Sequence, residues 1–469
     1  SWVLTSKQLN KRMTPSTEKN GVIYWFRNDL RLHDQPALQK AIETAQQQQT
    51  WLLPVYIHDT ALLENTAWGF ERTSPQRNAW TAMALRDLSR QLTEFGSQLL
   101  QMKGDPVECL KALCQELQPA LIYCEDIAAP YEEDHILRLQ EANLKVDTIW
   151  QSTLMCMSDL PFDATDVPDQ FTTFRQAVER PTLSVRQARP AISQLPKLPN
   201  LPHSQMLQSL QALQPAAIVL SESLLTLVPT SVPTPDPRSA FPWGSNQLDG
   251  GETSALAHLA RYCNGMLPSR YKQTRNGLYG LDYSTKWSPW LATGALSPRQ
   301  AWAAVKAHEK IHGANESTYW IGFELLWRDH FRWMHLKHGR KMYRFKGLSR
   351  QPVLIPHHQV EKFTAWCTGN TGHDFIDAGM RELISTSYVS NRMRQNLASY
   401  LIHDLACDWR AGAAWFESKL IDYDVYSNQG NWLYLSGHGT DPRGVRRFNP
   451  DKQAKDYDPE GVYRAMWLS

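Results

Sequence analysis

The sequence predicts an α/β amino-terminal domain, a doubly wound parallel sheet with helices on both faces, followed by an all-α carboxy-terminal domain. Two observations lead to this fold class. From residue 21 to residue 150, short apolar runs alternate with helical patterns, which is typical of a parallel sheet. After Gly250 the spacing of apolar residues is helical almost throughout. A chain of 469 residues is long enough for two or three domains whose cores need no disulfide support.

The elements of residues 21–150 follow one another in a regular order. Short apolar runs predict strands in GVIYWFR, WLLPVYI, SQLLQM, ALIYCED and KVDTIW. Helical spacing between them predicts helices near 36–48, 73–95, 105–117 and 130–143. The first strand is followed by NDLRLHD and not by G-x-G-x-x-G, so the usual dinucleotide-binding fingerprint is missing.

The remaining segments are expected to be a tail, a connector and the helical domain. Residues 1–20 lack the apolar stretch of a secretory signal, so we expect a disordered tail, although their basic, Ser/Thr-containing composition also permits an organellar transit remnant. Residues 151–249 are expected to form a connector that wraps between the domains, because 11 of the 28 prolines lie in 181–242. Residues 250–469 complete the chain as the helical domain.

Composition limits the classes of function. No run approaches the ~18 apolar residues of a membrane span, so no membrane partner is expected. The seven cysteines are odd in number and form no C-x-x-C pair, which indicates free thiols in a reducing compartment such as the cytoplasm. A net charge of +2 does not indicate a nucleic-acid binder, and we expect a monomer. The local run RGVRRFNPDKQAK, which includes Arg446, is either a solvated loop or a phosphate-contacting surface.

A helix is expected from Asn391, with Met393, Leu397 and Leu401 on its apolar face. Asn391, Arg394 and Gln395 fall together on the opposite face, where an ordinary amphipathic helix would meet solvent. The later segment IDYDVYSNQGNW changes this interpretation. It supplies two carboxylates, an amide and an indole, which suit a polar planar ring that changes charge; they are Asp422, Asp424, Asn428 and Trp432.

Two further motifs each have a structural and a functional interpretation. Ser284, Thr285 and Ser288 precede a helix, where they are either plain capping residues or part of an anion site. A single helical stripe also holds five residues: Trp320, Glu324, Trp327, Arg328 and Phe331. This stripe is either a core stripe with a Glu324–Arg328 pair worth ~0.3 kcal/mol, or the wall of a pocket for flipped-out bases.

The pattern HEKIH at 308–312 matches the zinc-peptidase motif, in which two histidines bind zinc and Glu309 acts as base. Gly313 follows at once, so the motif lies at a helix end, and no third histidine stands at the required spacing. We therefore expect no metal. A zinc hydrolase is kept only as an alternative that a metal assay decides.

Taken together, these segments resemble the photolyase/cryptochrome family, and closely the DASH cryptochromes, from about Gly21 to the carboxy terminus. Six motifs carry the resemblance. They are WFRNDLRLHD (25–34), GGETSALAHLARY (250–262), YKQTRNGLYGLDYSTKWSPWLATGALSPRQ (271–300), FELLWRDHFR (323–332), YVSNRMRQN, which contains Asn391, and IDYDVYSNQGNW, which contains Asn428. It implies FAD as cofactor and a deoxyribodipyrimidine photo-lyase of the DASH type. Excited reduced flavin would donate an electron to a cyclobutane pyrimidine dimer, the dimer would split, and the electron would return.

The resemblance also implies roles for individual residues. Glu324, Trp327, Asn391 and Asn428 would form the catalytic set, with the Asn428 amide facing flavin N5. Arg394 and Asp422 would form an ion pair over the ring. The remaining FAD-binding residues would be Tyr271, Ser284, Thr285, Lys286, Trp287, Ser288, Arg328 and Asp424, in addition to Glu324 and Asn391.

The implied substrate is single-stranded DNA that contains pyrimidine dimers, and RNA is a further candidate. Where duplex-acting relatives place Met and Trp in the lesion pocket, this chain has Gln395 and Tyr434, which would hold a flipped dimer less tightly. Glu324, Trp327 and Arg446 would complete the DNA contacts. Repair of (6-4) photoproducts needs two histidines, but Asn391 and Gln395 occupy those positions. A blue-light photoreceptor that binds FAD and nucleic acid without efficient repair remains the alternative.

Electron supply and the antenna are further expectations from the resemblance. Trp432 and Trp409 match the first two members of the family's tryptophan relay. The third position is Pro356, so Trp320 is a candidate substitute and Trp366 a weaker one. Asp126 is the best match for a carboxylate that contacts the antenna 5,10-methenyltetrahydrofolate, although an ordinary carboxylate at a strand end explains it equally well.

Overall fold

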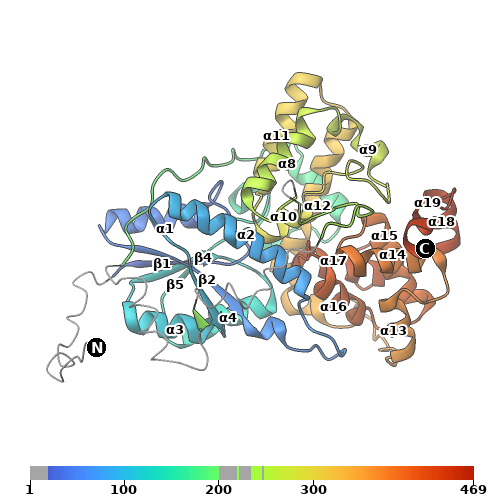
Figure 1. Ribbon diagram of the computed structural model, residues 1–469, viewed down its shortest axis with the longest axis horizontal. Helices are drawn as coiled ribbons and strands as arrows, with labels where there is room; N and C mark the ends of the chain where they lie inside the picture. The colour runs from blue at the N-terminus through green and yellow to red at the C-terminus, as the bar shows by residue number, and fades with distance from the viewer. Residues whose placement is uncertain (1–19, 200–218, 221–233, 246–247) are drawn as a thin grey trace.

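The computed structural model describes residues 20–199, 219–220, 234–245 and 248–469. The expected tail lies outside the described residues, except for Asn20, and so does much of the expected connector. The described chain has a sheet with its helices in the first part and only helices in the last part (Figure 1). The fold class predicted from the sequence is therefore confirmed.

The sheet has the order β5-β4-β1-β2-β3-β6. Its first five strands are parallel, and the short β6 pairs antiparallel with β3. The chain winds from β1 to β3 in one direction and then returns to place β4 on the other side of β1. The strand bounds are Val22–Phe26 (β1), Leu52–Asp59 (β2), Leu100–Gly104 (β3), Leu121–Glu125 (β4), Val146–Ile149 (β5) and Val219–Leu220 (β6).

Helices cover both faces of this sheet because successive side chains of β1 point to opposite sides. Ile23 and Trp25 belong to the core that includes residues of α3 and α4. Val22, Tyr24 and Phe26 belong to the core that includes residues of α1 and α2. All four helices begin with proline, and their bounds agree with the predicted ranges: Pro36–Gln47 (α1), Pro75–Glu94 (α2), Pro106–Leu117 (α3) and Pro130–Glu141 (α4).

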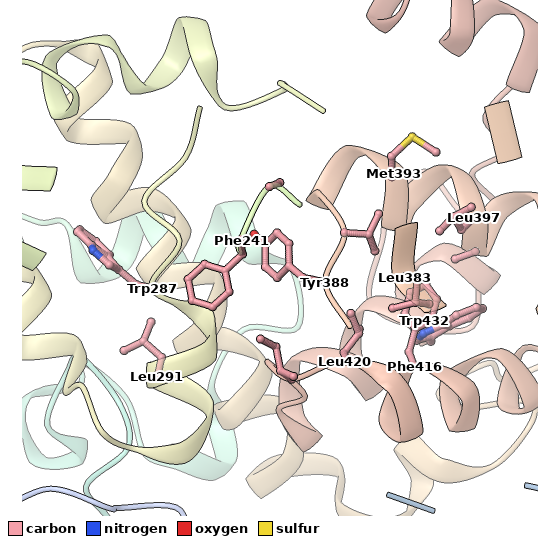
Figure 2. Packing of buried hydrophobic residues seen from close by; sticks show 14 of the residues in the cluster. Phe241, Trp287, Leu291, Leu383, Tyr388, Met393, Leu397, Phe416, Leu420 and Trp432 are labelled. Atoms are coloured by element: carbon pink, nitrogen blue, oxygen red, sulfur yellow. The ribbon is translucent and has the colours of Figure 1, made fainter. Parts of the chain in front are cut away.

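The carboxy-terminal half packs its helices around one large apolar core. Figure 2 shows part of that core, including Phe416 of α16 and Trp432 of α17. The bounds are Glu252–Asn264 (α8), Tyr271–Thr274 (α9), Ser288–Thr293 (α10), Pro298–His312 (α11), Glu316–His338 (α12), Val360–Thr368 (α13), Asp374–Thr386 (α14), Asn391–Ser399 (α15), Trp409–Lys419 (α16), Val425–Ser436 (α17), Pro450–Tyr457 (α18) and Val462–Leu468 (α19). A π-helical turn, Tyr400–Asp404, continues α15.

One helix of the expected connector belongs structurally to this half. Helix α5 (Phe171–Val178) buries Phe171, Phe174 and Val178 in the core of the helical part. Its position against α12 places an aromatic side chain from the connector beside the stripe predicted on that helix.

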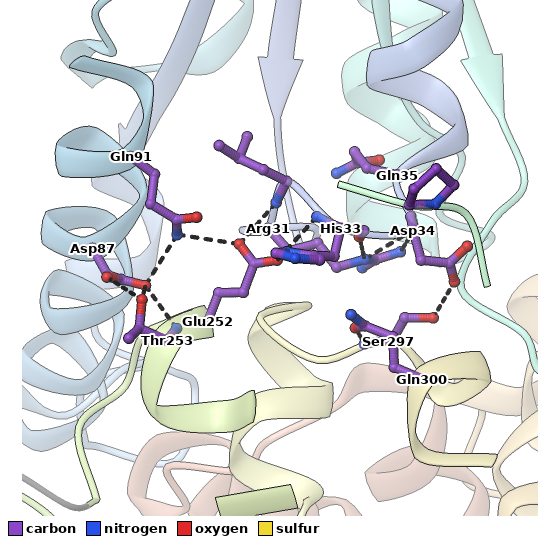
Figure 3. A network of polar contacts seen from close by, with 12 residues as sticks. Arg31, His33, Asp34, Gln35, Asp87, Gln91, Glu252, Thr253, Ser297 and Gln300 are labelled. Carbon is purple, nitrogen blue, oxygen red and sulfur yellow. Dashed lines mark hydrogen bonds and ion pairs between the residues drawn. The ribbon is translucent and has the colours of Figure 1, made fainter. Parts of the chain in front are cut away.

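The segment that follows β1 joins the two halves (Figure 3). The backbone N–H groups of Leu32 and His33 both donate to the Glu252 carboxylate at 2.9 Å. Asp34 accepts a hydrogen bond from Arg299 Nε at 2.8 Å, and both side chains are almost fully buried. Burial raises the pKa of Asp34, but the charges of Arg299 and Arg31 and the hydrogen bonds from Arg299 and Ser297 together outweigh this effect and lower the pKa below its usual value. NDLRLHD is thus an interdomain lock, because it bonds the sheet domain to Glu252 and Arg299 of the helical half.

Within the described ranges, no helix is both long enough and apolar enough to cross a membrane.

Candidate functional site

A cavity lies where the amino-terminal ends of α15 and α17 meet the loop before α17. Helix α15 begins at Asn391, as predicted, because the Ser390 side chain caps it by accepting the N–H of Met393. Met393 and Leu397 are fully buried, so the opposite face of the helix turns toward the cavity. The cavity is lined by the predicted polar residues Asn391, Arg394, Gln395, Asp422, Asp424 and Asn428, and by Trp432.

The ion pair expected between Arg394 and Asp422 is present, with Nη2 and Oδ2 at 2.8 Å. Ser288 Oγ donates to the same carboxylate at 2.7 Å, so the first residue of α10 reaches the cavity wall. Burial lowers the pKa of Arg394, but Asp422, Tyr388 and Tyr283 together outweigh this effect and raise the pKa above its ordinary value. The positions of both partners are fixed from three segments.

Asp424 is held by Arg332, a residue that the sequence analysis did not single out. Arg332 Nη1 and Nη2 donate to the two carboxylate oxygens at 3.0 and 3.2 Å, and Ser427 Oγ donates at 2.7 Å. Burial raises the pKa of Asp424, but Arg332 and Arg328 outweigh it and lower that pKa to about 2. The only available sign in the sequence was the spacing of Arg328 and Arg332 on α12, four residues apart.

Asn428 uses its amide nitrogen to donate to the carbonyl oxygen of Ala413 at 3.0 Å. This bond fixes which way the amide points, and its oxygen stays available as an acceptor.

Arg328 is a half-buried cation with little internal compensation. Its Nη1 donates to the carbonyl oxygen of Ser152 at 2.6 Å, and no carboxylate of the described chain lies within ion-pair distance. Burial, together with the charge of Arg332, lowers the pKa of Arg328 to about 9. A bound group with negative charge or several acceptor oxygens would relieve this cost. Arg328 is not among the residues that line the cavity, but the lining itself carries hydrogen-bond donors on Arg394, Gln395 and Asn428. These donors fit an acceptor-rich cofactor such as FAD.

The segment 284–288 forms a tight loop before α10. Lys286 adopts a positive φ of 57°, and its buried ammonium donates to the carbonyl oxygen of Leu281 at 3.0 Å. Burial lowers the pKa of Lys286 well below its ordinary value. Trp287 and Tyr271 are buried nearby in the core, and the Trp287 indole N–H has no hydrogen-bond partner. The carbonyl oxygen of Thr285 lies 2.8 Å from His258 Nε2, while Ser284 is partly exposed.

The predicted stripe on α12 lacks the Glu324–Arg328 ion pair that its interpretation as a core stripe included. Arg275 Nη1, on a different element, donates to Glu324 Oε1 at 2.8 Å, and Arg328 is directed to Ser152. The predicted Glu324–Arg328 ion pair is therefore wrong. The reason is tertiary: an arginine 49 positions away in the sequence lies closer to the carboxylate than the one a single turn away.

Trp327 stands between two rings from other segments. Phe171 stacks on it with ring centroids 3.8 Å apart and an interplanar angle of 13°. Tyr434 approaches edge-on at 5.6 Å. The Tyr434 hydroxyl accepts a hydrogen bond from Arg446 at 3.0 Å, and Arg446 also pairs with the buried Asp441. Trp327, Tyr434 and Arg446 therefore form one connected surface, whereas Gln395 lines the cavity itself.

The three tryptophans proposed for electron transfer occupy different places. Trp432 lines the cavity, and its ring contacts Phe416 and Trp366. Trp409 is buried and donates to the carbonyl oxygen of Phe345 at 2.9 Å. Trp320 instead stacks on Phe323, flanked by Lys272 and Arg275. Its ring contacts within the described chain do not include Trp409 or Trp432, whereas the Trp366 ring contacts Trp432.

Asp126 directly follows β4, and its backbone N–H donates to the carbonyl oxygen of Ile149. Burial raises the pKa of Asp126, with Arg27 opposing this effect. A second cavity, missed by the sequence analysis, opens at the carboxyl ends of the neighbouring strands β1, β2 and β3. Its lining includes Arg27, Tyr56, His58, Arg77, Lys103 and Tyr423, but not Asp126.

The histidines of the H-E-x-x-H pattern have a structural explanation. His308 Nε2 lies 2.7 Å from Ser269 Oγ, and Nδ1 lies 3.0 Å from the carbonyl oxygen of Cys263. Both ring nitrogens are thus engaged inside the protein. Among the residues that the structure describes, no three His, Cys, Asp or Glu side chains are grouped to hold a metal ion.

Comparison with known proteins places this geometry in context. Residues 22–197 match the DNA photolyase family, and residues 320–469 match the FAD binding domain of DNA photolyase. Proteins named Cryptochrome DASH are 40% identical in Gloeobacter violaceus, over 95% of this chain and 85% of that protein, and 41% identical in Xenopus laevis, over 95% and 82%. The crystal structure of a Synechocystis cryptochrome superposes with a TM-score of 0.85 at 38% identity, covering 96% of this chain and 88% of that one. The helical half is therefore an FAD-binding domain of the photolyase type.

Proposed function

Because the chain belongs to the DASH cryptochromes of the photolyase/cryptochrome family, we propose that it uses blue or near-ultraviolet light to split cyclobutane pyrimidine dimers, chiefly in single-stranded DNA. One observation carries the proposal. Helix α12 presents Trp327 beside Tyr434 and Arg446 and, less than two turns later, extends Arg332 to Asp424 in the cavity wall. A lesion stacked on Trp327 would lie next to the cofactor cavity.

FAD, when reduced and excited by light, supplies the electron that opens the dimer. The protein's own residues hold and orient the cofactor. Arg394 and Asp422 fix one wall of the cavity, and the Asn428 amide, oriented by the Ala413 carbonyl, offers an oxygen or nitrogen to a ring atom without adding charge. Arg328 supplies positive charge to an acceptor-rich ligand.

Substrate binding would rest on stacking and one carboxylate. One face of Trp327 is already covered by Phe171, so a flipped pyrimidine would use what remains of the ring. Glu324, whose side chain is 38% exposed and anchored by Arg275, would accept hydrogen bonds from the base. Asn391, exposed at the start of α15, would contact the cofactor or the lesion from the opposite side.

The preference for single strands would follow from Gln395 and Tyr434. Tyr434 is tied to Arg446 and presents only its edge to Trp327, so a flipped dimer gains little stacking there. In a duplex, that gain must offset a few kcal/mol of unstacking, whereas a single strand carries little of this cost. RNA with the same lesion would meet the same surface. We also propose methenyltetrahydrofolate as an antenna near Asp126.

The test is repair by chemically reduced, FAD-loaded protein under blue light. Single and double strands of one sequence, each with one thymine dimer, are illuminated, and intact thymines are quantified by chromatography. Faster repair of the single strand supports the proposal. Binding without release of thymines, under light and reduction, would instead make the protein a photoreceptor and would overturn the repair function.

A further inference from the structure

A continuous series of aromatic contacts begins at the cavity wall with Trp432. The Trp432 ring meets Phe416 with centroids 5.0 Å apart and Trp366 with centroids 6.2 Å apart. Trp366 is fully buried and stacks on Phe416 at 5.9 Å, with an interplanar angle of 17°. These three rings therefore form a closed triangle of mutual contacts that includes a lining residue of the cavity.

The same contacts continue outward from Trp366. Its ring stacks on Phe363 at 6.0 Å, Phe363 contacts His358 at 5.3 Å, and His358 contacts Trp68 at 4.9 Å. All these separations lie in the range of aromatic pairs that touch. Phe363, His358 and Trp68 line a surface groove, together with Phe70 and Trp415. The series thus runs from the cofactor cavity to a solvent-facing groove.

We infer that this series is an electron relay that lets light reduce the bound cofactor, with Trp366 as an inner member and Trp68 as the outer one. The inference rests on the proposed cofactor chemistry and deepens it. It supplies a route that the sequence lacked, because Pro356 occupies the expected third position and lies two residues before His358. The branch through Trp409 would run in parallel.

The electron balance is as follows. Trp432 gives an electron to the photoexcited oxidised flavin, Trp366 refills Trp432, and Trp68 refills Trp366 across Phe363 and His358. An external thiol reaching the groove refills Trp68 and releases a proton to water. Two such events would convert two thiols into one disulfide and release two protons, and the flavin reduced by two electrons would take up one of these protons from water.

Two local features favour electron transfer from Trp68 through Trp366 to Trp432. The Trp366 indole N–H donates to the carbonyl oxygen of Leu397 at 3.0 Å, so an acceptor dipole stabilises the positive charge of an oxidised indole. Trp415, the other tryptophan of the groove, has Lys419 Nζ 4.6 Å from its ring centre, and this cation opposes positive charge on that indole. The described chain places no cation over Trp68. Trp68 is therefore the better outer member.

The experiment compares FAD-loaded Trp366→Phe, Trp409→Phe and the double variant with the wild type. Each is illuminated with blue light and dithiothreitol without oxygen, and loss of the absorbance of oxidised flavin gives the photoreduction rate. Because the two branches act in parallel, each single change should lower the rate about twofold, and the double change should nearly abolish it. Transient absorption should show a smaller long-lived tryptophan-radical signal in Trp366→Phe.

Matched variants separate a relay from a structural role. Trp333→Phe, at a buried site stacked on Trp150 and away from the series, should photoreduce at the wild-type rate. On the exposed side, Trp68→Phe should slow photoreduction, and Trp415→Phe should change it much less. Urea unfolding and flavin content of each variant control for the lost indole hydrogen bond.

Unchanged photoreduction and radical signals in Trp366→Phe, both alone and in the Trp409→Phe background, would overturn the relay. Failure of the repair function is a separate outcome. It is assayed with dithionite-reduced protein, which needs no relay, and there Trp366→Phe should repair like the wild type.

Discussion

Replacing Asp422 with asparagine removes a negative charge from the cavity wall and almost no volume. The Asp422 side chain is 1% exposed, and it accepts hydrogen bonds from Arg394 at 2.8 Å and from Ser288 at 2.7 Å. In Asp422→Asn, Arg394 keeps its bond to the Val389 carbonyl oxygen but loses the one carboxylate that it pairs with in the described part of the chain. The guanidinium would then be a largely buried charge without an ion pair.

Breaking a buried ion pair from one side costs ~3–5 kcal/mol. Because the Arg394 side chain is still 22% exposed, water can solvate part of its charge, and we expect the lower end, about 3 kcal/mol. Changing both partners, Asp422→Asn with Arg394→Met, removes the stranded charge. The double variant should therefore be more stable than Asp422→Asn alone.

The assay is equilibrium urea unfolding at a fixed FAD concentration, followed by tryptophan fluorescence. Asp456→Asn is the matched control, since the Lys452–Asp456 pair is 71% and 40% exposed and its loss should cost less than about 0.5 kcal/mol. If Asp422→Asn costs no more than Asp456→Asn, or if the double variant is the least stable, the ion pair does not hold the cavity wall as described.

Three further predictions concern pH, the domain interface and lesion binding. Burial lowers the pKa of His335 to about 4, below its unfolded value near 6.5, so the unfolded state binds the proton first. The free energy of unfolding should therefore fall as pH drops from about 6.5 to about 4. His335→Gln should make this pH dependence weaker in urea titrations, and an unaltered pH dependence would contradict the prediction. Asp34→Asn leaves Arg299 buried without its carboxylate and should cost about 3 kcal/mol, seen in calorimetry as a lower or split transition, whereas an unchanged melting profile would show that the lock is not needed. Trp327→Ala should weaken binding of dimer-containing single strands by ~1–3 kcal/mol, because one stacking platform is lost; fluorescence anisotropy measures this, and equal losses for undamaged DNA would mean that Trp327 does not recognise the lesion.

Local patterns in the sequence were sufficient for the parallel strands and four helices of the α/β domain and for the composition of the main cavity. The four helices of the α/β domain begin and end within a few residues of their predicted bounds, since apolar periodicity and initial prolines act over single turns. Helix α15 begins at Asn391 through an equally local signal, the Ser390 side chain that caps it. The polar face of that helix and the segment around Asp422 were each visible in the sequence, and they line one cavity.

Only the tertiary structure decided which side chains meet. Glu324 pairs with Arg275, Asp424 pairs with Arg332, and Trp327 stacks on Phe171. In each pair the partners belong to different segments of the chain. The tertiary structure also brought Trp68 within contact of His358, which ends an aromatic series that no spacing rule could reveal. Hydrophobic periodicity reports which face of an element is buried, but partner choice depends on how those buried faces pack in three dimensions.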